Sequence, residues 1–278
     1  MLKNVIVTSV AFMFLFTAFQ SMAVLQNSLY PTSDGGLGTW SLSTVYVGLI
    51  IGSLLLPTFI INRVTIKYTI FVAMFGYVLY ICGQFYPEFY TLVPAAFITG
   101  LCASCLWSAK CTYLTILGHE YGRLTGQDSE VVIVRFFGIF FFFFQSASVW
   151  GNLISSLVLG SGQSKEGNDP EICGVNYCPS TDLKNATLNK DDDDDKTTLY
   201  VLAGIYLGCA VAAAIIIFTL LDPLHRYGEK KREGSPVELI LATAKQMKHP
   251  YQILLIPLTI WSGMEQGFWG ADFTAVNT

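Results

Sequence analysis

The sequence predicts an all-α polytopic membrane protein, and three observations support this fold class. Hydrophobic residues make up 53% of the 278 residues and charged residues only 13%, about half the charged share of a soluble domain. The apolar residues come in blocks of about 20, the length of a helix that spans about 30 Å of hydrocarbon. The chain also lacks metal-ligand spacing, a nucleophile motif, a phosphate-binding glycine loop and a basic nucleic-acid patch. No enzymatic activity, cofactor or metal site is therefore expected.

Seven membrane helices are expected in order along the chain. The first apolar block follows Lys3 and could be a secretory signal, but it exceeds the 7–15 apolar residues of such signals, so we interpret it as a retained helix. Trp40 opens the second helix as an interfacial aromatic residue, and Pro57 should kink that helix. The expected helices cover residues 4–25, 41–61, 68–86, 90–118, 132–159, 199–221 and 251–273.

These helices define three parts of the chain. Residues 1–221 form a six-helix transmembrane half, residues 222–250 a basic cytoplasmic linker, and residues 251–278 a seventh helix with a truncated C-terminus. The linker contains Ser235-Pro236-Val237-Glu238, a capping box that predicts an interfacial helix over 236–248. Six helices, a linker and one more helix are the first part of a twelve-helix transporter architecture. Such a chain needs the missing half or a partner to cover its exposed face.

The distribution of basic residues predicts the orientation. With the N-terminus in the cytoplasm, most lysines and arginines lie on the inner side, as the positive-inside rule requires. The long polar loop 161–198 is then extracellular or lumenal, where the sequon at Asn185 is open to glycosylation. Cys173 and Cys178 in the same loop are candidates for a local disulfide. The outer loop contains the remaining basic residues outside the membrane, Lys165, Lys184, Lys190 and Lys196.

Two further patterns have plain interpretations. The run Asp191–Asp195 is expected to be a solvated loop, because five adjacent aspartates repel one another and lack the alternating ligand spacing of a calcium loop. A native Ca²⁺ collector and an engineered tag are the alternatives. Cys102 and Cys105 have redox-motif spacing, but within a membrane helix they are expected to be small packing residues.

Lys110 is the main candidate functional residue, because a cation inside a membrane helix costs about 3 kcal/mol or more. Trp107 and Tyr113 lie three residues before and after it, so the three can share a broad helix face. Glu265 in the seventh helix is a possible ion-pair partner across a central cavity. The alternative is that Lys110 extends toward the inner interface, with Trp107 and Tyr113 as packing residues.

Other polar and small residues inside the apolar blocks complete the candidate set. Gln20 and Gln145 either line a cavity or hydrogen-bond to a neighbouring helix. Two GxxxG pairs permit close approach between helices. These predicted packing pairs are Gly48 with Gly52 and Gly204 with Gly208.

Four segments carry a resemblance to a known family. They are FTAFQSMAVLQNSL at 16–29, WSAKCTYLT at 107–115, EICGVNYC at 171–178 and WSGMEQGFWGADFT at 261–274. The chain resembles the unc-93-like branch of the major facilitator superfamily, most closely its homolog A type. The superfamily signature Gly-x-x-x-Asp-Arg-x-Gly-Arg is reduced here to residues 62–67, which weakens any inference of ordinary transport gating.

The resemblance implies a non-enzymatic membrane protein that regulates or escorts other membrane proteins, potassium channels among them. It implies no cofactor and carries no catalytic residues onto this chain. The plasma membrane is the expected location, with endomembranes as the alternative. A secondary transporter of an unidentified small solute is the competing function, and Lys110 and Glu265 are its motivating residues.

Overall fold

The computed structural model describes residues 1–29, 36–162, 192–224, 245 and 248–268. The long elements in these ranges are all α-helices, which confirms the predicted all-α class. They are α1 (Leu2–Leu29), α2 (Leu37–Arg63), α3 (Ile66–Gly83), α4 (Phe89–Thr125), α5 (Ser129–Gly162), α7 (Asp192–Leu220) and α9 (Pro250–Phe268).

Six of the described helices, α1 to α5 and α7, are long and apolar enough to cross a membrane. The chain is therefore a multi-pass membrane protein. α9 has a lower mean hydropathy than these six spans, because its apolar residues are interrupted by Gln252, Glu265 and Gln266. The seventh span stays a prediction for this reason.

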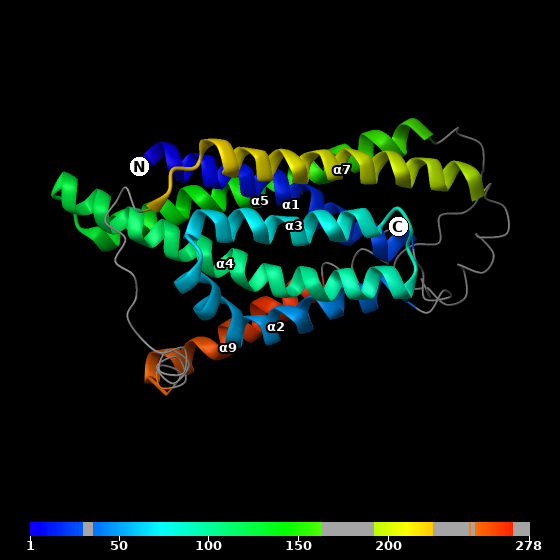
Figure 1. The fold of residues 1–278 in the computed structure, drawn as a ribbon. Helices are drawn as coiled ribbons and strands as arrows, with labels where there is room; N and C mark the ends of the chain where they lie inside the picture. The colour runs from blue at the N-terminus through cyan, green and yellow to red at the C-terminus, as the bar shows by residue number, and fades with distance from the viewer. Residues whose placement is uncertain (30–35, 163–191, 225–244, 246–247, 269–278) are drawn as a thin grey trace.

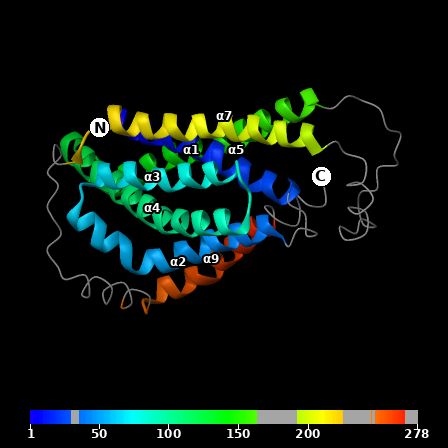
Figure 2. The same cartoon turned by 45° about the vertical axis from the view of Figure 1, so that its right-hand side comes forward.

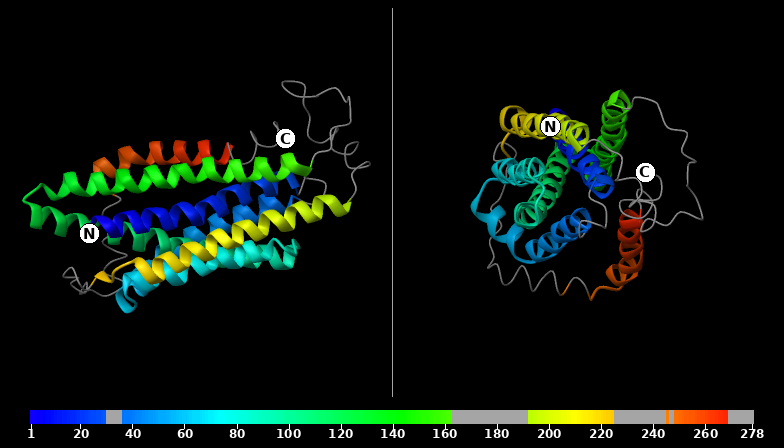
Figure 3. Two further views of the ribbon diagram at one scale, coloured as in Figure 1. Left: turned by 90° about the horizontal axis from the view of Figure 1, so that it is seen from above. Right: turned by 90° about the vertical axis from the view of Figure 1, so that its right-hand side faces the viewer.

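The six apolar helices run side by side along one common direction in an elongated bundle (Figure 1). α4 packs extensively against α2, α3 and α5, whereas α1 packs against α5 and α7. The turned view separates α3 and α4 from α2 and shows that α2 bends along its length, as expected of a helix that contains Pro57 (Figure 2). The end-on view places α9 at the edge of the bundle (Figure 3), and each of its described residues is exposed.

Aromatic rings fill the middle of the bundle between α1, α4 and α5. Ring centroids lie 5.1 Å apart for Phe12 and Phe140, 5.4 Å for Phe16 and Trp107, and 4.9 Å for Phe16 and Phe144. These are the edge-to-face distances at which aromatic pairs attract each other beyond simple burial. The helices that carry the candidate site therefore share one rigid aromatic core.

The predicted polar loop over 119–131 is wrong in most of its length. α4 continues to Thr125, and Gly126 ends it in the left-handed conformation (φ 68°) that favours glycine. α5 begins at Ser129, where the Asp128 side chain accepts a hydrogen bond from the backbone N–H of Glu130 at 3.0 Å. Polar residues extend the helices here because the segment leaves the apolar part of the bundle, and the α4–α5 hairpin projects beyond its neighbours (Figure 1).

The expectation of a solvated loop over the aspartate run is also wrong for its larger part. α7 begins at Asp192, so the backbone of the following aspartates is helical. The physical reason is the helix dipole, because negative side chains are stabilising in the first turn of a helix.

Candidate functional site

Lys110 lies in the interior of the bundle with its charged end among aromatic rings. Only 1% of the residue is exposed. Its Nζ lies 4.1 Å from the ring centroid of Phe140, 4.7 Å from that of Trp107, and 5.2 Å from those of Phe137 and Phe141. We call these four rings the aromatic cage.

The spacing of residues on two helices explains how the cage forms. Trp107 precedes Lys110 by three residues on α4, so both side chains leave the helix on one side. Phe137, Phe140 and Phe141 are three and four residues apart on α5 and share the face toward α4. Each cation–π contact contributes about 0.5–2 kcal/mol, depending on how far it is desolvated. Several together offset the cost of about 3 kcal/mol for a membrane lysine.

Neither expected arrangement of Lys110 is present in the structure. Glu265 lies on the exposed helix α9, and it makes no ion pair with Lys110 in the described residues. Lys110 also does not extend to an aqueous interface, because it is 1% exposed. Aromatic ring faces stabilise the ammonium in place of a carboxylate or water.

Trp107 has two roles in this arrangement. Besides facing Lys110, it contacts the rings of Phe16 at 5.4 Å and Phe144 at 5.3 Å. It is thus both a packing residue, as one interpretation held, and a wall of the cage.

Tyr113 is fully buried on α4 but is engaged elsewhere. Its hydroxyl donates a hydrogen bond to the backbone oxygen of Asp222 at 2.8 Å. The Asp222 carboxylate forms an ion pair with Lys3 at 3.5 Å. These contacts connect the start of α1, the middle of α4 and the segment after α7 at one end of the bundle.

Gln20 contacts the neighbouring helix, as one of its two interpretations held. Its Oε1 accepts a hydrogen bond from the Ser148 hydroxyl of α5 at 2.7 Å. Gln145 lies one turn earlier on α5 and is exposed, as is Asn152 one turn later. α5 therefore presents a row of polar side chains, which we call the α5 polar row and define as Gln145, Ser148, Asn152 and Ser156.

The two glycine pairs differ in their surroundings. A Cβ at Gly48 would lie 2.6 Å from the Phe97 backbone oxygen, and one at Gly52 would lie 2.6 Å from Ser104 Oγ, so both glycines face α4. At Gly204 and Gly208 nothing described lies within 4 Å of an added Cβ. In the described structure α7 makes no close helix contact through this second pair.

Sequence reasoning missed two features of the bundle. Gly100 is the α4 counterpart of the α2 glycines, and an added Cβ would overlap the Val45 backbone oxygen. The Tyr80 hydroxyl links α1 and α2, because it donates to Gln26 Oε1 at 2.7 Å and lies 2.9 Å from the Ser41 hydroxyl. Gln26 directly follows the first apolar block, and a glutamine at this position is the signal that could have indicated such a partner.

Several candidates lie outside the described residues. They are the glycosylation residue Asn185, the proposed disulfide residues Cys173 and Cys178, and the interfacial helix over 236–248. In the described ranges, no group of three or more histidine, cysteine or acidic residues has the geometry to hold a metal ion.

Comparison with known proteins gives one consistent result. Residues 34–276 match the family described as "Ion channel regulatory protein UNC-93". The chain is 41% identical to "Protein unc-93 homolog A" of Xenopus laevis over 281 residues, and 40% identical to the Homo sapiens protein of that name over 280 residues. These matches cover 98% of this chain and 60% of each relative.

A nematode relative has a more specific description. The chain is 35% identical over 279 residues to "Putative potassium channel regulatory protein unc-93" of Caenorhabditis elegans. The match covers 96% of this chain and 38% of that protein. The chain thus spans about three fifths of the length of the vertebrate relatives and less of the nematode one.

Proposed function

Because the chain belongs to the UNC-93 family of ion channel regulatory proteins, we propose that it is a non-enzymatic membrane protein that regulates an ion channel. The match of residues 34–276 to that family carries the proposal. A potassium channel is the favoured partner, because the nematode relative is described as a putative potassium channel regulatory protein. Binding occurs between membrane helices, without a cofactor.

The α5 polar row supports a binding surface on this helix. Gln145, Asn152 and Ser156 are exposed on a helix that is apolar enough to span a membrane. Polar side chains that face hydrocarbon lose their hydrogen bonds to water, whereas a neighbouring protein helix can restore them. This face is therefore better suited to contact with protein than with lipid.

The proposed orientation and location follow from the sequence. The N-terminus is cytoplasmic and the segment 161–198 is extracellular or lumenal, as the excess of inner basic residues and the sequon at Asn185 indicate. The plasma membrane is the proposed site of action. Glycosylation at Asn185 and a disulfide between Cys173 and Cys178 belong to the same proposal.

The test is co-purification. Membranes are solubilised in mild detergent, the tagged chain is isolated, and the channel that is recovered with it is measured. Cells would express the chain with each member of a panel of potassium channels. We expect at least one channel to be recovered and its current to change. The double variant Gln145→Leu, Asn152→Leu should lower recovery about fivefold or more, since each interhelical hydrogen bond contributes about 0.6–2 kcal/mol.

Val149→Leu is the matched control, because Val149 is an exposed apolar residue of the same helix. It should leave channel recovery unchanged. The proposal would be contradicted if no channel were recovered while the intact chain was abundant in the same membranes. It would also be contradicted if the double variant lowered only the abundance of the chain, while the amount of channel recovered per molecule of chain stayed the same.

A secondary transporter of a small anionic solute is the second candidate function. The buried cation of Lys110 is the observation behind it, because ionisable residues inside membrane helices often mark solute pathways. Uptake of labelled organic anions into vesicles containing the chain should then exceed uptake into empty vesicles. Lys110→Met should abolish the difference. Equal uptake by the unmodified chain and by Lys110→Met would contradict this second candidate function.

A further inference from the structure

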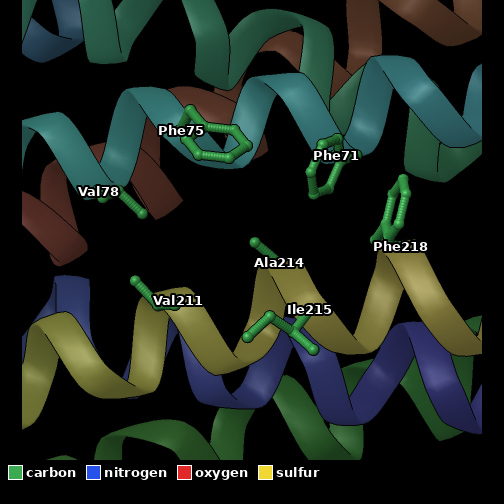
Figure 4. Close-up of a pocket in the computed structure, with 7 residues that line it drawn as sticks. All are labelled: Phe71, Phe75, Val78, Val211, Ala214, Ile215 and Phe218. Atoms are coloured by element: carbon green, nitrogen blue, oxygen red, sulfur yellow. The ribbon is translucent and has the colours of Figure 1, made fainter.

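A second feature of interest is an apolar pocket on the outside of the bundle, away from the cage. It lies between α3 and α7 and has a volume of about 160 Å³. Figure 4 shows side chains of both helices on its two sides. Its main walls are Phe71, Phe75 and Val78 from α3 and Val211, Ile215 and Phe218 from α7.

The chemistry of the walls excludes a polar solute. All the lining side chains are hydrocarbon, so a polar ligand would lose its hydrogen bonds to water without replacement. The pocket is also smaller than the roughly 300–1,000 Å³ of ordinary small-molecule sites. It has room for a flexible apolar segment such as part of an acyl chain.

The pocket opens on the outer surface of the bundle. Phe75, Ile215 and Phe218 are each more than half exposed, and they belong to helix segments that are apolar enough to span a bilayer. A groove on such a surface is filled by lipid hydrocarbon, because an empty gap loses the dispersion contacts of its walls.

A cation lies at one end of this groove. Lys67, in the first turn of α3, has its Nζ 5.9 Å from the ring centroid of Phe218, a wall residue. Lys67 takes part in none of the ion pairs found in the described residues. A positive charge at the end of an apolar groove is complementary to a lipid with an anionic headgroup.

We propose that the groove between α3 and α7 binds an acyl chain of an anionic phospholipid whose headgroup is held by Lys67. The acyl chain lies against the phenylalanine and branched side chains of both helices. The Lys67 ammonium donates hydrogen bonds to oxygens of the headgroup. This site is separate from the α5 polar row and does not depend on channel regulation.

The experiment uses photoactivatable phospholipids and the full chain in nanodiscs. Two probes share one acyl chain with a diazirine and differ in headgroup, phosphatidylserine or phosphatidylcholine. We expect the serine probe to label α3 and α7 about fivefold more than the choline probe. Mass spectrometry of peptides locates the label.

Variants separate the headgroup from the groove. Lys67→Gln should remove the preference for phosphatidylserine, and Lys67→Arg should keep it, because the charge is restored. Val211→Trp should fill the groove and lower labelling by both probes, and Val211 is 40% exposed, so the larger ring fits without disturbing the core.

Two controls match these variants. Arg135→Gln removes an exposed basic residue of α5, and Ile205→Phe enlarges an exposed side chain of α7 that does not line the groove. Neither should change labelling of the groove. Equal labelling by both probes in the unmodified chain would overturn the proposal, as would labelling that persists in Val211→Trp.

Discussion

Replacing Lys110 with glutamate is expected to lower the free energy of unfolding by about 3–5 kcal/mol, the range for an uncompensated buried charge. The faces of aromatic rings carry negative electrostatic potential, so they attract the ammonium and repel a carboxylate. Because the whole stability of a protein is about 5–15 kcal/mol, the variant should lose a large share of its stability and unfold at a markedly lower temperature. Recovery of monodisperse protein after heating in mild detergent measures the loss.

Lys110→Met provides the matched comparison. Methionine has nearly the same length and flexibility, so it keeps the packing against Phe140 while removing the charge. The lost cation–π contacts and the removed desolvation cost largely offset each other, and we expect a change under about 1.5 kcal/mol. If glutamate were tolerated as well as methionine, the ammonium would not lie among the rings as described.

The second large effect is expected at the crossing of α2 and α4. Gly100→Ala places a methyl group against the backbone of α2, where Leu49 N would lie 2.8 Å and Gly48 C 2.9 Å from the new carbon. Backbone atoms cannot rotate away, so the two helices must separate. We expect destabilisation of about 1–3 kcal/mol, the usual range for overpacking, seen as a lower midpoint of thermal aggregation.

Gly204→Ala is the control for this prediction. It makes the same chemical change in a membrane helix, but nothing described lies within 4 Å of the added carbon. Removing a flexible glycine from a helix stabilises it by about 0.5–1 kcal/mol. The midpoint should therefore stay the same or rise. A fall as large as that of Gly100→Ala would show that loss of glycine, rather than helix contact, determines stability.

The fold class follows from composition and block length, and these also located the six apolar helices. Helix ends were harder to predict. Residues 119–125 are polar, which suggested a loop, yet α4 includes them. This end of α4 packs on α5 through Tyr121, whose ring lies 5.6 Å from that of Phe136, and the Glu120–Arg123 ion pair one turn apart supports the helix. Polarity alone cannot distinguish such a helix from a loop.

The candidate site was only partly predictable. The position of Lys110 in an apolar block correctly indicated that it is unusual. The expectation that a buried cation pairs with a carboxylate, however, led to Glu265. The partners are rings that the sequence presents as part of a plain apolar run, Phe140 and Phe141. Likewise, Gly48 and Gly204 have the same local pattern but different neighbours. In both cases, the neighbours of a residue depend on how its helix is rotated about its own axis in the bundle.

The aromatic cage has a consequence for motion between helices. An ion pair depends on two small groups at a fixed separation, so a shift of one helix along another breaks it. Ring faces are broad, and four of them lie 4.1–5.2 Å from the ammonium of Lys110. A small shift of α5 along α4 would therefore leave the cation facing a ring. The cation–ring contact is less sensitive to the register of the two helices than an ion pair would be.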